Sequence, residues 1–134
     1  MSCELADWLL AHIEQDEYRA DALGAAGWGA GAMAGFGPCV ISDTYPDEFL
    51  LGLMEMSVIA VCKGEDAHQK NDHIAHWNPR RVMAECVAKR QIVRHFRVAL
   101  DRGTPTEIVV WHHALRIAAL PYQQEPGYRE EWRP

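Results

Sequence analysis

The residues best suited to chemistry lie in segment 73–97, where basic residues follow a helix-start signal. Asn78 is a favoured N-cap residue, and Pro79 suits the first position of a helix. Arg80 and Arg81 then occupy the first turn, where the helix dipole disfavours positive charge. A phosphate or a carboxylate bound at this helix start would compensate these charges. The segment therefore predicts a site for an anion.

Further basic residues continue along the same predicted helix. Arg90 and Arg94 are one turn apart and share a face, while Lys89 falls near the centre of the apolar stripe. The predicted anion-binding set is His73, Arg80, Arg81, Lys89, Arg90 and Arg94. The alternative is a structural network in which these bases pair with acidic residues, namely Glu85, Glu107, Glu130 or Glu131. The sequence favours the network, because most charged runs in proteins are paired or solvated.

Metal binding and catalysis have weaker support. His73 and His76 have a spacing that suits zinc on a helix, with Asp72 or Cys62 as further ligands. The chain has no dense Cys/His pattern and no C-x-x-C pair, so we predict no metal site and no cofactor. The glycine-rich segment 24–38 lacks the Gly-Lys-Ser/Thr ending of a phosphate loop. Because no catalytic motif is complete, we predict no catalytic residue and a protein that is not an enzyme.

Charge is distributed unevenly along the 134 residues, which by their number predict a single domain over 1–134. The net charge is −6, yet residues 1–60 hold ten acidic residues and one basic residue, whereas residues 61–134 hold twelve bases and nine acids. The two halves are expected to neutralise each other across the fold. The overall acidity weighs against DNA binding, since phosphate contacts dominate affinity for DNA.

The location of the protein is predicted from what the sequence lacks. No apolar run reaches the roughly 18 residues that span a bilayer. The start of the chain has neither the basic residues nor the apolar core of a signal peptide. We therefore expect a cytoplasmic protein whose four cysteines are reduced.

The first half of the chain predicts a helix followed by a small sheet. Apolar residues recur at helical spacing over residues 3–25, with acidic residues on the other side. The glycines of 24–38 argue against a regular helix there. Runs of β-branched residues at 40–42 and 56–62 predict strands, and segment 49–54 is ambiguous between strand and helix. Together they predict a small antiparallel sheet in the middle of the chain.

The second half predicts helices and an aromatic tail. A short helix over about 65–76 is followed by a long one over about 79–100. Thr104 and Glu107 have the spacing of a capping box and begin a third helix that ends near residue 120. The tail over 122–134 is expected to pack along the body. The predicted fold class is therefore α+β: an N-terminal helix, a small central antiparallel sheet, and C-terminal helices with a packed aromatic tail.

Two blocks of the second half resemble a known family. The first contains His73-Ile74-Ala75, then Pro79 and Arg81-Val82, then Ala88-Lys89-Arg90. The second contains Leu120-Pro121-Tyr122 and the ending Tyr128-Arg129-Glu130-Glu131-Trp132-Arg133-Pro134. Both are similar to blocks of a family of small proteins of unknown function from actinobacteria and their phages. The resemblance implies origin and domain extent, and it implies no activity.

These features predict a non-enzymatic accessory or interaction protein, encoded by a phage and acting on a host protein. The acidic first helix would meet a basic partner, and the aromatic tail favours a homodimer. The predicted partner-binding residues are Glu14, Asp16, Glu17, Tyr128 and Trp132. One alternative is a protein that binds a small anionic ligand or nucleotide at the basic helix start. Another is a DNA-binding regulator, although nucleic acid and membranes are not expected partners.

Overall fold

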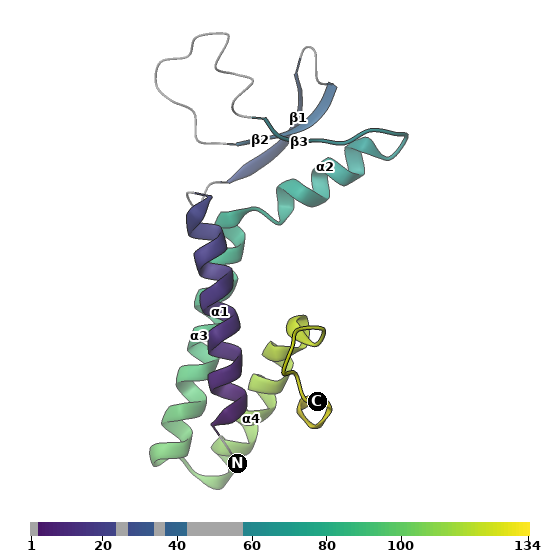
Figure 1. The fold of residues 1–134 in the computed structure, drawn as a ribbon. Coiled ribbons are helices and arrows are strands. Elements are labelled where there is room, and N and C mark those ends of the chain that lie inside the picture. Colours follow the sequence, from purple (N-terminus) through teal and green to yellow (C-terminus); the bar gives the residue numbers. More distant parts are fainter. Residues whose placement is uncertain (1–2, 24–26, 34–36, 43–57) are drawn as a thin grey trace. The chain divides into compact units, whose positions relative to one another are not determined.

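The computed structural model describes residues 3–23, 27–33, 37–42 and 58–134 (Figure 1). Its elements are helix α1 (Glu4–Ala22), strands β1 (Trp28–Met33), β2 (Gly37–Ser42) and β3 (Val58–Val61), helices α2 (Ala67–His76), α3 (Pro79–Arg102) and α4 (Pro105–Ala119), and the short 3-10 turns η2 (Leu120–Tyr122) and η3 (Glu130–Trp132). This order confirms the predicted α+β class. The ambiguous segment 49–54 lies outside the described residues. None of the described helices combines the length and the apolar character needed to cross a bilayer.

The chain divides into two compact units. The first contains Met1–Tyr18 together with Ala84–Pro134, and the second contains Arg19–Met83. The first unit thus holds most of α1 and α3 and all of α4, and the second holds the strands and α2. The expectation of a single domain over 1–134 stays a prediction.

The second unit is an antiparallel sheet packed on α2. The described strands are ordered β1-β2-β3, and Trp28 of β1 lies opposite Ser42 of β2. The pairing of β2 with β3 shifts register between Val40 and Ile41, which is typical of a β-bulge. Helix α2 contacts β1 and β2, and Cys39 and Val40 of β2 are fully buried. The small antiparallel sheet predicted for the middle of the chain is therefore confirmed.

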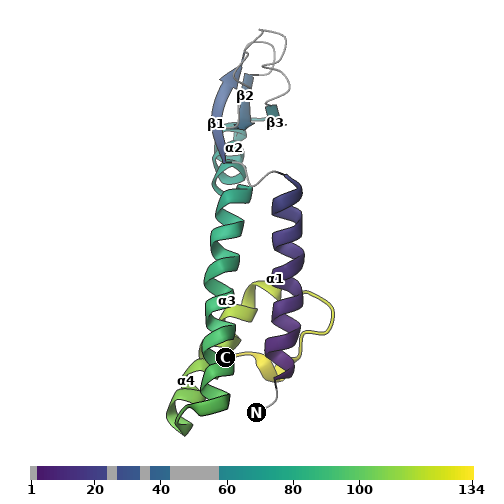
Figure 2. The same ribbon diagram turned by 90° about the vertical axis from the view of Figure 1, so that its left-hand side faces the viewer.

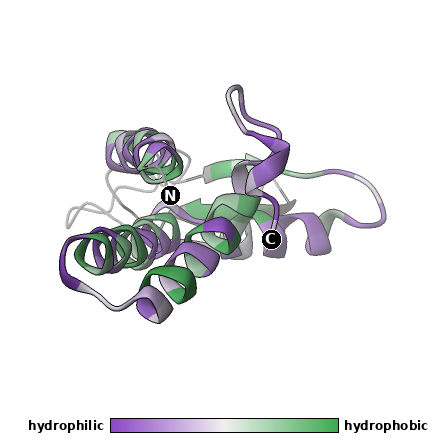
Figure 3. Ribbon diagram, turned by 90° about the horizontal axis from the view of Figure 1, so that it is seen from below, coloured by the Kyte–Doolittle hydropathy of each residue, from purple (hydrophilic) through white to green (hydrophobic). Residues whose placement is uncertain are grey.

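Three amphipathic helices form the core of the first unit. Figure 2 shows α1 and α3 side by side, and Figure 3 shows that both hydrophobic and hydrophilic residues occur along the helices. The buried side chains of α1 recur at intervals of about one turn, so they form one apolar face of the helix. The largest fully buried apolar side chains of this unit are Leu5, Leu9, Ile13, Phe96 and Leu115. The ring centroid of the buried Phe96 lies 5.6 Å from that of His112 of α4.

The turn between α3 and α4 has the local chemistry that the sequence predicts. The Thr104 amide donates to the Glu107 carboxylate at 2.7 Å, and the Glu107 amide donates to Thr104 Oγ1 at 3.3 Å, which completes the capping box. Gly103 precedes it, and a Cβ there would lie 2.7 Å from backbone atoms of Ala99. Only glycine therefore fits this close approach.

The aromatic tail packs on the helices of its own unit, as expected. Trp132 and Tyr122 are buried. The Trp8 indole of α1 donates to the Pro126 carbonyl at 3.1 Å, and Arg116 Nε of α4 donates to the Trp132 carbonyl at 3.0 Å. Hydrogen bonds from two helices therefore hold the end of the chain in place.

Candidate functional site

The six predicted anion-binding residues fall into two groups of three. His73, Arg80 and Arg81 belong to the second unit, and Lys89, Arg90 and Arg94 belong to the first. The predicted anion-binding set is therefore divided between the two units.

The helix start in the second unit is organised around Trp77. Asn78 Oδ1 accepts from the Arg81 amide at 3.1 Å, which confirms Asn78 as the N-cap of α3. The Arg81 guanidinium lies 4.5 Å from the centroid of the Trp77 ring and hydrogen-bonds to His76. The ring centroid of His73 is 6.4 Å from that of Trp77. The positive charge of Arg81 thus lies against the aromatic face of Trp77. The position of Trp77 in the sequence, after two histidines and before two arginines, already indicates this role.

No metal centre is formed by the part of the chain that the structure describes. There, no group of three or more His, Cys, Asp or Glu side chains is arranged to hold a metal ion. Burial raises the pKa of the Cys86 thiol, so this cysteine is held as a neutral hydrophobe.

Two arginines of α3 form ion pairs with α1. Arg90 makes a two-pronged contact with Glu17, with Nε–Oε1 at 2.6 Å and Nη2–Oε2 at 2.5 Å. The hydrogen bonds from Arg90 hold the pKa of the Glu17 carboxyl below its usual value. Arg97 Nη2 lies 2.6 Å from Asp7 Oδ1. Acidic residues of the first half therefore neutralise bases of the second half, as the charge distribution suggests.

Three of the four carboxylates predicted for the network have partners other than the bases of α3. Glu107 is used in the capping box of α4, while Glu130 pairs with Arg133 and Glu131 with Arg129. The residues that meet α3 instead come from α1, more than seventy positions away in the chain. A network exists, but its acidic members are set by helix packing.

Lys89 reaches a carboxylate through a tyrosine. Its Nζ donates to the Tyr122 hydroxyl at 3.0 Å, and that hydroxyl donates to Asp16 Oδ2 at 2.7 Å. Burial and then the Asp16 contact raise the pKa of Tyr122 far above its usual value. Lys89, which the sequence places near the apolar stripe, thus reaches a carboxylate only through the Tyr122 hydroxyl. This relay also engages the half-buried Asp16 within the unit.

The predicted partner-binding residues have different surroundings. Glu17 pairs with Arg90, whereas Glu14 is 60% exposed and 4.0 Å from the same guanidinium. The aromatic rings of Tyr128 and Trp132 pack against Trp8, with centroids 5.7 and 5.3 Å away. Trp132 is only 7% exposed. Of these five residues, Glu14 presents the most open side chain in the described structure.

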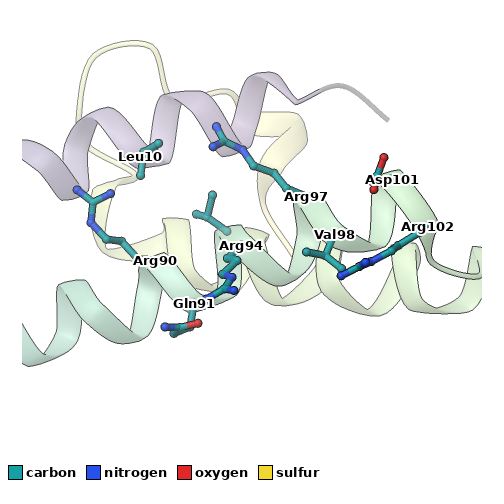
Figure 4. Close-up of a pocket in the computed structure, with 9 residues that line it drawn as sticks. Leu10, Arg90, Gln91, Arg94, Arg97, Val98, Asp101 and Arg102 are labelled. Atoms are coloured by element: carbon teal, nitrogen blue, oxygen red, sulfur yellow. The ribbon is translucent and has the colours of Figure 1, made fainter.

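A groove of about 610 Å³ runs along α3 beside Leu10 of α1. Its α3 lining extends from Arg90 to Arg102. Figure 4 shows Arg90 and Arg97 reaching toward α1, whereas Gln91 and Arg94 extend toward the opposite edge. The groove therefore separates arginines that meet α1 from side chains that point away from it.

The outward side of α3 carries an exposed row that we call the α3 strip. It consists of Val87, Gln91, Arg94, Val98 and Arg102, with Asp101 at its edge. The spacings of four and three residues place these side chains on one face of the helix. Val87 and Val98 are 56% and 38% exposed. Within the described residues, Arg94, Asp101 and Arg102 form no hydrogen bond or ion pair with one another or with any other group.

The α3 strip therefore combines two exposed valines with charges of both signs that have no partner in the described part of the chain. The sequence prediction included Arg94 but missed Val98, Asp101 and Arg102. The signal that identifies them is the continuation of the four–three spacing to the end of the helix.

Comparison with known proteins gives one match. A family model described as a family of unknown function (DUF6221) matches residues 2–134. No curated protein and no solved structure matches the chain. The function is therefore inferred from the fold and from the α3 strip.

Proposed function

The chain belongs to the family of unknown function DUF6221, and we propose that it is a non-enzymatic interaction protein that binds a protein partner through the α3 strip. The observation that carries the proposal is the set of charges on that strip that have no partner among the described residues, beside valines that are 56% and 38% exposed. The buried face of α3 lies on the other side of the helix, so the strip is not needed for the core of the unit.

The form of the strip favours a helical partner over a small molecule. Val87, Gln91, Arg94 and Val98 follow the four–three–four spacing by which two helices pack along a seam. Small-molecule sites are usually enclosed and mostly apolar, whereas this groove lies open and is lined by several charged side chains. Charges of both signs at such a seam select the partner and its register.

The proposal places the binding surface on α3 in preference to the acidic face of α1. Asp16 and Glu17 accept hydrogen bonds from Tyr122 and Arg90, so they have fewer free lone pairs for a partner. The resemblance to proteins of actinobacteria and their phages supports a phage origin, and a phage-encoded chain would act on a host protein or on a copy of itself.

Site-specific photo-crosslinking tests the proposal in cells that express the full chain. A photoreactive amino acid at Gln91 should give a discrete crosslinked protein, and Arg94→Glu in the same chain should weaken that crosslink. The same amino acid at the exposed Gln124 of the tail is the matched control. Absence of a crosslink from Gln91, or one that is equal at Gln124 and insensitive to charge reversal, overturns the proposal.

A small anionic ligand is the second candidate, because Arg94 lies one turn from both Arg90 and Arg97. A ligand at 100 times its Kd would add about 2.7 kcal/mol to the stability of the fold. Thermal unfolding with inorganic phosphate and a nucleotide panel tests this, with Arg94→Gln as the control. An unchanged Tm across the panel removes this candidate. DNA binding gains no comparable support, because the chain has a net charge of −6 and phosphate contacts dominate affinity for DNA.

A further inference from the structure

We infer that the partner of the α3 strip is a second copy of this chain, packed antiparallel so that Arg94 of each copy pairs with Asp101 of the other. This inference rests on the proposed function. It names the partner, the direction of the two helices and their register.

Arg94 and Asp101 have complementary charges that cannot meet within one chain. They are seven residues apart on the same helix, which separates their backbones by about 10.5 Å along the axis. Seven residues complete almost two turns, so both side chains lie on the same edge of the strip. Both are exposed, and neither has a hydrogen-bond or ion-pair partner among the described residues. Each therefore offers a charge to a molecule that docks on α3.

A two-fold axis between the two copies allows Arg94 and Asp101, seven residues apart, to form two ion pairs. In a symmetric antiparallel pair of helices, residues on one edge of the contact face the same edge of the other copy. When the axis passes between Arg97 and Val98, Arg94 stands level with Asp101 of the second copy. The symmetry repeats this pair on the other side of the axis. The two Val98 side chains then meet near the centre, where their exposed apolar surface is covered.

An in-register parallel pair and an antiparallel pair shifted by seven residues both bring like charges together. A parallel pair places each residue opposite itself, so Arg94 meets Arg94 and Asp101 meets Asp101. Sliding one copy of the antiparallel pair by seven residues produces one of these two contacts again. Like charges placed opposite each other disfavour a complex. The charge pattern therefore selects the antiparallel pair with the axis beside Val98.

Charge reversal with rescue tests the pairing on the purified full chain. Arg94→Asp and Asp101→Arg each place like charges across the axis, so we expect the dimer to weaken at least about tenfold in sedimentation velocity. The double variant restores opposite charges and should recover the dimer. Arg133→Asp, at an exposed tail residue outside the strip, is the control that should leave the dimer unchanged. Circular dichroism checks that every variant keeps its helices.

Disulfide trapping tests the register independently. The exposed Cys3 and the half-buried Cys62 are first replaced by serine. Val98→Cys should then form an intermolecular disulfide under mild oxidation, because the two positions lie beside the axis. Gln91→Cys is the matched control on the same strip. Its two copies would lie about 20 Å apart along the axes, beyond the reach of a disulfide.

The outcomes separate this inference from the proposed function. Loss of the dimer in both single variants with recovery in the double variant supports the pairing. A dimer that tolerates both single variants, or trapping at Gln91→Cys with none at Val98→Cys, overturns it. A monomeric chain whose Gln91 crosslinks to a different protein overturns the second copy but keeps the interaction role. A monomer that crosslinks to nothing overturns both.

Discussion

Arg90 and Arg94 are identical residues one turn apart on α3, yet their surroundings differ completely. Arg90 holds Glu17 through two hydrogen bonds, and Arg97 holds Asp7. Arg94 has no such contact in the described part of the chain. The difference arises from α1, which lies along one side of α3 and brings its acidic residues to Arg90 and Arg97. A basic residue of α3 therefore stabilises the fold where the neighbouring helix places an acidic residue beside it, and otherwise stays available at the surface.

The two ion pairs also define how α1 and α3 run. Asp7, near the start of α1, meets Arg97, and Glu17, near its end, meets Arg90. This order is possible only if the two helices are antiparallel. A change that loosens their packing should therefore remove both ion pairs together, whereas a change at Arg94 should leave them intact.

The largest expected effect comes from Phe96→Ala, which breaks the comparison by loosening all three helices. Phe96 is fully buried, and removal of a buried phenyl ring costs about 3–5 kcal/mol. Chemical denaturation of the full chain measures this loss in the free energy of unfolding. Val98→Ala, on the exposed strip of the same helix, is the control and should change the free energy of unfolding by less than about 1 kcal/mol. Equal losses in both variants would contradict the assignment of buried and exposed faces.

Tyr122→Phe tests the contacts of Lys89, the basic residue of α3 that reaches a carboxylate through a tyrosine. The substitution removes the hydroxyl that accepts from Lys89 and donates to Asp16, so two half-buried charged groups each lose a hydrogen bond. We expect the free energy of unfolding to fall by about 1–3 kcal/mol. Tyr18→Phe is the control, because the Tyr18 side chain is 77% exposed. An equally small effect at both tyrosines would argue against the relay.

Arg90→Gln and Arg94→Gln sharpen the comparison directly. The Arg90 pair is partly screened by solvent, since its side chains are 38% and 23% exposed. Its loss should therefore cost only about 0.5–1 kcal/mol. Arg94→Gln should change the free energy of unfolding by less than about 0.5 kcal/mol when measured on the monomer. A larger cost at Arg94 than at Arg90 would reverse the assignment of structural and available arginines.

The smallest effect is the pH dependence of the Glu17 pair. Because Arg90 lowers the pKa of Glu17 in the folded chain, this pair stabilises the fold above the pKa of the unfolded carboxyl, about 4.3. The contribution is lost as pH falls through the lower folded pKa. The stability difference between the wild type and Glu17→Gln should therefore shrink on acidification. A difference that stays constant from neutral to acidic pH would show that the ion pair does not contribute.

Local signals in the sequence predicted much of the fold. Asn78 and Thr104 carry side chains that cap helices through hydrogen bonds within three residues, so their roles depend on nearby chain only. The glycines before residue 38 oppose helix formation, and the structure has strands there. The boundaries were less accurate, since α1 ends at Ala22 and α3 continues to Arg102. Helix ends depend partly on packing, which a periodic pattern does not contain.

The sequence by itself determined the elements, their apolar faces and the presence of basic residues along α3. It did not determine which acidic residue each base would meet, because those contacts join residues such as Glu17 and Arg90 that are 73 positions apart. The rotation and register of two packed helices decide such pairs, and residue spacing within one helix carries no information on either. Tertiary structure alone therefore decided that Arg90 and Arg97 stabilise the fold, while Arg94 and Asp101 remain available at the surface.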